Sequence, residues 1–333
     1  MLIVHDAWLS RDLPRQVVAT IGNFDGVHRG HQRILAEVRA RSSELDSSSA
    51  VVTFEPHPLE VLHPEAAPSR ITTLAQKVEL FESAGMDAVL VIEFTPDFAR
   101  TSAASFVSDL LVERMKVSEV HVGSSFVFGH EREGDLTLLQ RQGRELGYAA
   151  RGVEEVTWRG EAISSSRIRS AILAGQTEDA MEMLGRPFTV TGVIARGDRM
   201  GKRIGWPTIN LTPDHDLLPA DGVYTCRVSF PSFPATFDCV TNIGTRPTVY
   251  ENYRRVVESH ILDFRSDVYD EPVKLAFYKR LREEMIFPTV MDLSAQIGRD
   301  VEATREFFAL RRRLDNGSSP LEKALQGAER DDS

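Results

Sequence analysis

The chain has few cysteines, no long apolar run and no excess of positive charge. Its two cysteines, Cys226 and Cys239, are too few for a disulfide framework or a four-ligand zinc site. No stretch approaches the roughly 18 apolar residues that span a membrane. The first residues, MLIVHDAWLSRDLPR, place no apolar core behind a basic head, so we expect no signal peptide. These absences predict a cytoplasmic protein without a membrane partner.

The balance of charge is acidic. Lys and Arg total 39 against 49 Asp and Glu, which gives a formal net charge of -10. Because phosphate backbones attract basic surfaces, this excludes nucleic acid as the main partner. Local positive sites for small phosphates stay open, and so does weak self-association. A length of 333 residues predicts two domains.

The first half of the sequence alternates between strand and helix patterns. Short apolar runs rich in β-branched residues occupy positions 17–21, 51–54, 88–92 and 120–122, as in strands buried on both faces. Strand–helix alternation of this kind predicts a Rossmann-like α/β domain, a parallel sheet with helices on both sides. Helix patterns between the runs are formed by Leu74, Val78 and Phe81, and by Phe106, Leu110 and Leu111 behind Ser102 as an N-cap.

The pattern changes near Gly185, where short strands separated by turn residues replace the helices. Tyr224, Cys226 and Val228 alternate with Thr225 and Arg227 at a period of two. This predicts a small antiparallel β-barrel or sandwich, followed by a helix over 300–310 and a polar, mobile tail. The expected domains are therefore residues 1–184, 185–314 and the tail 315–333.

The segment 20–31, TIGNFDGVHRGH, joins an apolar strand to an amphipathic helix. Its glycines, Gly22, Gly26 and Gly30, let backbone N–H groups approach an anion, and the helix N-terminus adds partial positive charge. His28 and His31 are three residues apart, so they share a face near the helix start. Both could donate to a phosphate. Two surface histidines, or half of a metal site, remain alternatives at this point.

With further segments, this loop resembles a known family. The form GNFDGVHRGH is similar to the HxGH-type motif of nucleotidyltransferases, as found in FAD synthetases. Residues 53–58 (TFEPHP), 123–134 (GSSFVFGHEREG) and 163–169 (ISSSRIR) resemble the next motifs in order. The chain thus looks like a prokaryotic bifunctional riboflavin kinase/FAD synthetase.

The resemblance implies roles for these residues in adenylyl transfer, in which the FMN phosphate attacks the α-phosphorus of ATP and pyrophosphate leaves. His28 and His31 would be catalytic, stabilising the ATP phosphates. Ser125 stands at a flavin-binding position where the family often has Asn or Asp, and Ser166 replaces a Thr. Nucleotide binding is implied for Gly22, Asn23, Phe24, Asp25, Ser164, Ser165, Ser166 and Arg169.

A second candidate site lies at 192–211, GVIARGDRMGKRIGWPTINL. Thr208 and Asn210 alternate by two, so they face one side of an extended strand. Their hydroxyl and amide oxygens suit Mg²⁺. Lys202 and Arg203 lie in the loop before them and could contact phosphate. Two polar side chains facing solvent at the start of a strand are the alternative.

This segment also resembles the riboflavin kinases, through their glycine-rich loop and PTxN motif. The resemblance implies that Gly197, Gly201 and Lys202 bind nucleotide, that Thr208 and Asn210 bind metal, and that Asn210 also contacts flavin. Glu258, in ESHILDF, matches the catalytic base that accepts the proton of the riboflavin 5′-hydroxyl.

The expected activity is therefore twofold: riboflavin is phosphorylated to FMN, and FMN is adenylylated to FAD. ATP is the co-substrate of both steps, Mg²⁺ the cofactor, and FMN and FAD the products. One alternative is an adenylyl- or cytidylyltransferase for another substrate. Others are a non-enzymatic flavin- or nucleotide-binding regulator and a kinase with weak adenylylation.

Overall fold

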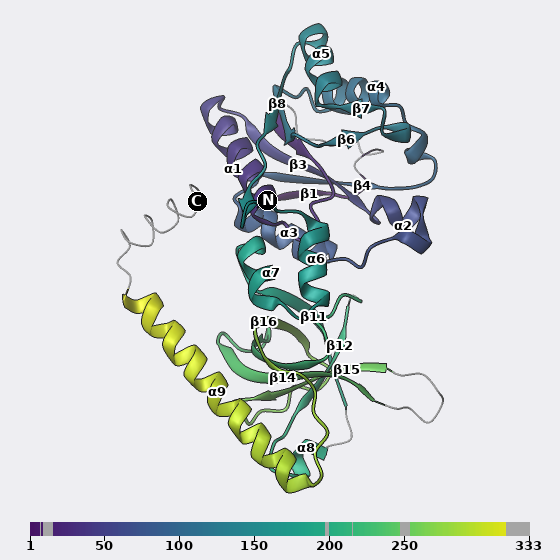
Figure 1. The fold of residues 1–333 in the computed structure, drawn as a ribbon. Coiled ribbons are helices and arrows are strands. Elements are labelled where there is room, and N and C mark those ends of the chain that lie inside the picture. Colours follow the sequence, from purple (N-terminus) through teal and green to yellow (C-terminus); the bar gives the residue numbers. More distant parts are fainter. Residues whose placement is uncertain (7, 9–15, 197–199, 215, 247–253, 318–333) are drawn as a thin grey trace. The chain divides into compact units, whose positions relative to one another are not determined.

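A computed structural model (Figure 1) describes residues 1–6, 8, 16–196, 200–214, 216–246 and 254–317. The chain forms two compact units, Met1–Ser165 and Ser166–Ser333. The expected phosphate-binding Gly197 lies outside the described residues, and so does most of the predicted tail, from 318 to 333.

The first unit is built on a six-stranded sheet in the order β1-β4-β3-β2-β5-β8, with every neighbouring pair parallel. The predicted Rossmann-like α/β domain is confirmed, and the expected strands fall within β2 to β5. The sheet consists of β1 (Leu2–Val4), β2 (Val17–Ile21), β3 (Ser48–Glu55), β4 (Ala88–Glu93), β5 (Glu119–Gly123) and β8 (Ala149–Val153).

Successive residues of the strands point to opposite faces of the sheet and are buried in two separate hydrophobic cores. On β2, Ala19 and Ile21 pack with Leu110 and Leu139 on one face, whereas Val18 packs on the other face. The second face is covered by α1 (Arg29–Glu44) and α3 (Leu74–Ser83), and the first by a π-helical segment (Phe106–Arg114) and α5 (Leu136–Leu146). Because alternate residues of a strand are buried in different cores, both faces of the strand are apolar. This explains why the strands are continuous apolar runs in the sequence.

Ser102 caps the short helix α4 (Ala103–Ser105), which leads into the π-helical segment, so the predicted N-cap is confirmed. The remaining elements of the unit are short. They are α2 (Pro58–Leu62), the 3₁₀ turns Pro64–Ala66, Phe98–Arg100 and His130–Arg132, and the antiparallel pairs of β6 (Val127–Phe128) with β7 (Gly134–Asp135) and of β9 (Thr157–Trp158) with β10 (Glu161–Ala162).

The strand order reverses next to β2. From β2 the chain runs through β3 to β4 on one side, and β5 and β8 are added on the other side. Ligands of open α/β sheets bind at such a switch point, outside the carboxyl ends of the strands. The loop after β2 and the loop after β5 both start there, although about 100 residues separate them in the sequence.

The second unit contains a closed six-stranded barrel in the order β11-β12-β15-β14-β13-β16, with antiparallel neighbours (Figure 1). The predicted barrel is confirmed, and Tyr224, Cys226 and Val228 are buried as their alternation indicates. Its strands are β11 (Phe188–Ala195), β12 (Ile209–Pro213), β13 (Gly222–Ser229), β14 (Thr236–Arg246), β15 (Arg254–Ile261) and β16 (Pro272–Arg282).

The helices of this region are α6 (Ser165–Leu173), α7 (Thr177–Leu184), α8 (Met200–Arg203) and α9 (Val290–Gly317). The last helix is longer at both ends than the expected 300–310, so that prediction was wrong, and the helix includes residues 315–317 of the expected tail. Contacts with the barrel support both extensions. Ser294 accepts from Trp206 Nε1 at 3.0 Å and Ile297 packs on the core before residue 300, and Arg312 donates to Asp238 at 2.9 Å after residue 310.

Candidate active sites

The loop between β2 and α1 is tightly wound. Phe24 and Val27 have φ of 50° and 38°, and Gly26 has φ of 86°. Left-handed conformations at non-glycine residues are costly and persist only where the surroundings enforce them. This loop therefore owes its shape to its contacts with the rest of the unit.

The two histidines meet at the start of α1. His28 is the N-cap, and its Nδ1 accepts a hydrogen bond from the backbone N–H of His31 at 3.4 Å. Accepting at Nδ1 leaves the hydrogen of the neutral ring on Nε2, which is then a donor. The two rings stack with centroids 3.6 Å apart and an angle of 19° between planes. A Cβ at Gly30 would lie 3.2 Å from the His28 ring, so glycine leaves room for the ring there.

Phe24 and Asp25 are turned toward the protein. Phe24 is buried and packs edge-on against Phe81, and its ring also contacts that of His31. The Asp25 carboxylate accepts hydrogen bonds from the backbone N–H groups of Ile71 and Thr72, at 2.9 and 3.0 Å. These side chains shape the loop.

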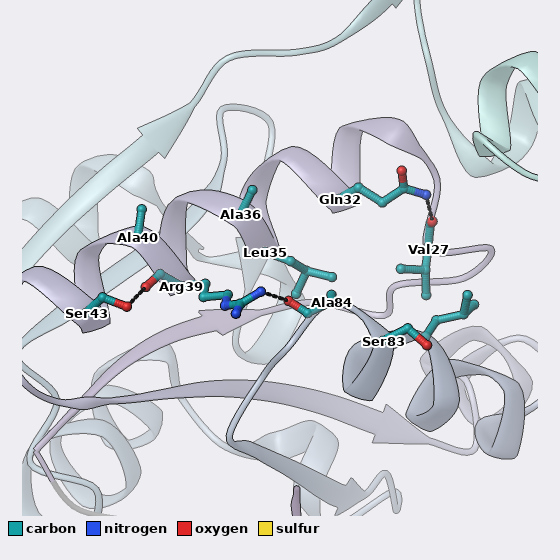
Figure 2. Close-up of a pocket in the computed structure, with 10 residues that line it drawn as sticks. Val27, Gln32, Leu35, Ala36, Arg39, Ala40, Ser43, Ser83 and Ala84 are labelled. Atoms are coloured by element: carbon teal, nitrogen blue, oxygen red, sulfur yellow. Dashed lines mark hydrogen bonds between the residues drawn. The ribbon is translucent and has the colours of Figure 1, made fainter. Parts of the chain in front are cut away.

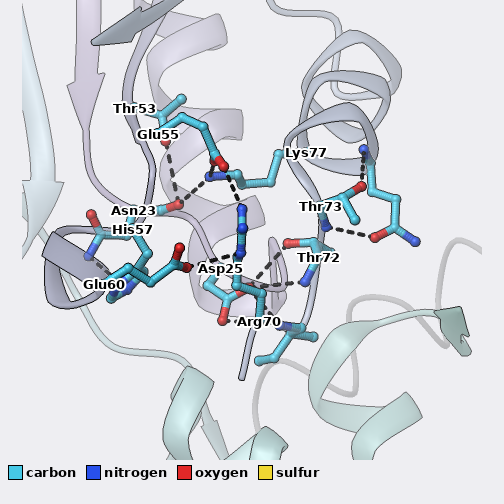
Figure 3. Close-up of polar contacts among 12 residues, drawn as sticks. Asn23, Asp25, Thr53, Glu55, His57, Glu60, Arg70, Thr72, Thr73 and Lys77 are labelled. Carbon is cyan, nitrogen blue, oxygen red and sulfur yellow. Dashed lines mark hydrogen bonds and ion pairs between the residues drawn. The ribbon is translucent and has the colours of Figure 1, made fainter. Parts of the chain in front are cut away.

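A polar network that the sequence analysis missed lies behind Asn23 (Figure 3). The Asn23 carbonyl accepts from Lys77 Nζ and Thr53 Oγ1, both at 3.4 Å. The Asn23 amide lies 3.4 Å from His57 Nε2, and Lys77 Nζ lies 3.8 Å from Glu55. Residues of β3 and α3 thus surround the start of the loop. No sequence motif marks Lys77, because only the folded chain brings it to the loop.

The other residues predicted for the first site are spread over three segments. The Ser165 hydroxyl donates to the Asp25 carbonyl at 2.8 Å, which joins the ISSSRIR segment to the loop. Ser164 precedes it and is exposed, and Ser166 and Arg169 follow on α6 in the second unit. Ser125 is exposed on the connection after β5.

The second unit contains a cavity of about 340 Å³ at the barrel. Thr208, Asn210, Glu258 and Gly201, all chosen from the sequence, line it together. Lys202, in contrast, is exposed on α8 and is not part of the lining. The predicted metal ligands and the predicted base are therefore brought to one place.

Strand register explains this convergence. Asn210 on β12 is the direct partner of Glu258 on β15, and Glu258 is in turn the partner of Asn242 on β14. Directly opposed residues of antiparallel strands point to the same face. Asn242 also donates to Glu284 at 3.4 Å, so a second carboxylate lines the cavity near Glu258. The sequence reasoning missed Asn242 and Glu284 as lining residues, because register is not visible in the sequence.

One wall of the cavity is anchored to α9. Trp206 Nε1 donates to Ser294 at 3.0 Å, and the Trp206 ring lies edge-on to His260. Arg282 forms a two-pronged ion pair with the buried Asp300, with a closest distance of 2.8 Å. The helix beyond the barrel is thus part of the site.

A larger cavity, of about 580 Å³, lies between α1 and α3 (Figure 2). It is lined by small and aliphatic side chains, and its polar groups bond within the unit. Gln32 donates to the Val27 carbonyl at 2.9 Å, and Arg39 to the Ala84 carbonyl at 3.5 Å. We assign no chemistry to it, because it gathers no set of titratable groups.

The folds and sites define a class of two-domain phosphate-transferring proteins. One domain has the parallel sheet of nucleotidyltransferases, with its histidine pair at the switch point, and the other has the closed barrel of flavokinases. The family model described as FAD synthetase matches residues 10–167, and the one described as riboflavin kinase matches residues 184–308.

Curated relatives agree over almost the whole chain. The bifunctional riboflavin kinase/FMN adenylyltransferase of Pseudomonas fluorescens is 40% identical over 89% of this chain and 94% of its own. That of Escherichia coli K12 is 39% identical, over 88% and 93%. This chain therefore belongs to the bifunctional riboflavin kinase/FMN adenylyltransferase family, as the motifs indicated.

A solved structure is similar in fold over most of the chain. A crystal structure titled as a macrolide-efflux protein from Streptococcus pneumoniae is similar with a TM-score of 0.82 and 27% identity, covering 92% of this chain and 99% of that one. In the part of this chain that the structure describes, no helix is both long and apolar enough to cross a membrane.

Proposed function

We propose that this protein makes FMN and then FAD, with one reaction at each of the two sites. The observation that carries the kinase assignment is the convergence of Thr208, Asn210 and Glu258 on one cavity. It lies in the unit matched by the riboflavin kinase family model. A transferase for another substrate would not need this second site, and a regulator would need no base beside its ligand.

In the kinase step, the 5′-hydroxyl of riboflavin attacks the γ-phosphorus of ATP and ADP leaves. Glu258 accepts the hydroxyl proton as the new O–P bond forms. Asn210 lies directly opposite Glu258 on the neighbouring strand, so it orients the same substrate hydroxyl. Gly201 lines the same cavity and lets the backbone approach the nucleotide. We also assign nucleotide binding to Gly197 and to Lys202, which is exposed on α8.

The oxygen donors of the cavity fit Mg²⁺. Thr208 supplies a hydroxyl and Asn210 an amide oxygen, and hard oxygen ligands with ATP phosphates and water suit this ion. Thr208 and Asn210 would hold it there, and bound Mg²⁺ supplies charge neutralisation for the transferred phosphoryl group. The acidic wall formed by Glu258 and Glu284 favours a cation at the same place.

In the adenylyl transfer, an oxygen of the FMN phosphate attacks the α-phosphorus of ATP and pyrophosphate leaves. His28 donates from Nε2 and His31 stands in contact with it, so both stabilise charge that grows on the phosphates. Gly22 and Asn23, at the start of the loop, bind the nucleotide together with Phe24 and Asp25, whose buried side chains also hold the shape of the loop. Ser164, Ser165, Ser166 and Arg169 bind the nucleotide phosphates, and Ser125 contacts the flavin.

The functional domains that we propose are residues 1–184 for adenylyl transfer and 185–314 for the kinase. The first includes α6 and α7, which carry the last residues of the ISSSRIR segment. We place the enzyme in the cytoplasm, where ATP and riboflavin are both at hand, and propose that any self-association is weak.

The direct test is to give purified protein riboflavin, ATP and MgCl₂ and to separate the flavins by chromatography. FMN should appear first and FAD second. Absence of both products would refute the proposed function. FMN without FAD would favour a kinase with weak adenylylation. That alternative arises because Ser125 replaces the Asn or Asp that is frequent in the family.

A further inference from the structure

Lys77 occupies an unfavourable position for a cation. It lies in the first turn of α3, where the helix dipole opposes positive charge, and only 5% of it is exposed. Burial lowers the pKa of its ammonium group, against the attraction of Glu55 and Asp25. Both burial and the helix dipole disfavour a lysine at this position. Its presence therefore indicates a role other than stabilising the helix.

The contacts of Lys77 lead to the loop that carries the histidines (Figure 3). Its Nζ lies 3.4 Å from the Asn23 carbonyl and 3.8 Å from Glu55 at the end of β3. Glu55 is also paired with Arg70, which in turn pairs with Glu60 at 3.0 Å. Lys77 is thus the member of this ion-pair chain that reaches the loop backbone.

The residues just before Lys77 in the sequence also contact the loop, next to Asn23. Ile71 and Thr72 donate to the Asp25 carboxylate, and the backbone N–H of Gly26 donates to Thr72 Oγ1 at 2.9 Å. Segment 70–77 therefore contacts the loop from Asn23 to Gly26, immediately before His28. Because Phe24 and Val27 have positive φ, these contacts must maintain a conformation that the loop would not keep alone.

We propose that Lys77 is a positioning residue for adenylyl transfer: its ammonium group holds the Asn23 carbonyl and so fixes the backbone that presents His28 and His31 to the nucleotide. The proposal rests on the proposed function of this site. A small displacement of catalytic groups costs up to about 100-fold in rate, so loss of this contact should be visible in kcat.

The experiment compares Lys77→Met, which keeps the length and removes the charge, with Lys77→Arg, which keeps the charge and the donors. Lys116→Met is the matched control, since Lys116 is exposed in the same unit. Each full-length protein is assayed for FAD formation from supplied FMN, and separately for FMN formation from riboflavin. Near-UV circular dichroism monitors tertiary structure, and hydrogen exchange monitors the amides of residues 23–28.

We expect Lys77→Met to lower kcat for FAD formation about tenfold or more, with KM for FMN within about twofold of wild type. Exchange of the loop amides should rise, and kinase activity and the near-UV spectrum should stay as in wild type. Lys77→Arg should restore at least about a third of the rate. Lys116→Met should behave as wild type throughout.

Other outcomes would overturn the proposal. FAD formation within twofold of wild type in Lys77→Met would show that the contact does not position the loop. Loss of the near-UV signal would assign Lys77 to folding instead, as would equal failure of the Arg variant. A wild-type protein that makes no FAD would refute the function of the site itself, which is a separate result.

Discussion

His28 and His31 stack on each other at the first turn of α1, one as its cap and the other three residues later. His28 accepts a hydrogen bond from the backbone N–H of His31, so the positions of the two side chains depend on each other. Replacing either one therefore disturbs both donors.

We predict that His28→Ala lowers FAD formation about 100-fold or more, the usual effect of removing one donor to a charged transition state. FMN should then accumulate from riboflavin, because the barrel site is untouched. Chromatography of the flavins measures both steps in one sample. If the variant lost kinase activity too while remaining folded, the assignment of one reaction to each site would be wrong.

For Glu258→Gln we predict the reverse pattern. The amide keeps the shape of the side chain and cannot accept the hydroxyl proton, so FMN formation should fall about 100-fold or more. FAD formation from supplied FMN should continue at the wild-type rate. Glu306→Gln, at an exposed position of α9 in the same unit, is the matched control. A kinase rate in Glu258→Gln equal to that of the control would exclude a catalytic base at this position.

Removing the Asp25 carboxylate should weaken the first unit. Asp25→Ala leaves the N–H groups of Ile71 and Thr72 without their acceptor in a buried place, which costs about 1–3 kcal/mol. Urea unfolding of the first unit should show the loss. Asp25→Asn keeps one acceptor oxygen and should lose less. Equal stability of all three proteins would mean that these hydrogen bonds do not hold the loop.

The first unit should also lose stability in acid through Glu119. The hydrogen bond from Arg41, then the one with His121 and the positive charge of Arg151, lower the pKa of this buried carboxyl to about 2, from 4.5. A group whose pKa is depressed by folding contributes stability above its unfolded pKa, and the contribution is lost as the pH falls from about 4.5 toward 2. Glu119→Gln should therefore flatten the pH dependence of unfolding in this window.

The tryptophans make this measurable. The chain has Trp8 and Trp158 in the first unit and Trp206 in the second. In a Trp206→Phe background, fluorescence then reports the first unit alone during urea unfolding between pH 6 and pH 2.5. The same slope with and without Glu119 would place the acid sensitivity at other groups.

The sequence predicted those parts of the sites that are local. The strand–loop–helix of residues 20–31 contains its own turn residues, histidine spacing and amphipathic helix, so its form could be predicted from one short window. The two-residue spacing of Thr208 and Asn210 likewise placed both side chains on one face, and both line the cavity.

Partners set by the register of distant strands and helices could not be predicted. Asn242 meets Glu258 because β14 and β15 pair in one particular register, and Lys77 reaches Asn23 across 54 residues. The last helix was predicted too short. Leu293 and Ile297 continue the four-residue spacing of Val301 toward its start, and only the folded barrel shows that they face its cavity.

The positions in the sequence of the last strand of the parallel sheet and of the barrel determine when each unit can fold during synthesis on the ribosome. The last strand of the parallel sheet ends at Val153, so the first unit is complete once about half of the chain has been made. The barrel joins its first strand, β11, to its last, β16, and so cannot close before Arg282 has emerged. Because domains fold as units during translation, the unit that uses FMN should form before the one that makes it. A nascent chain released after residue 184 but before Arg282 would then add adenylyl groups to FMN from other molecules without producing any of its own.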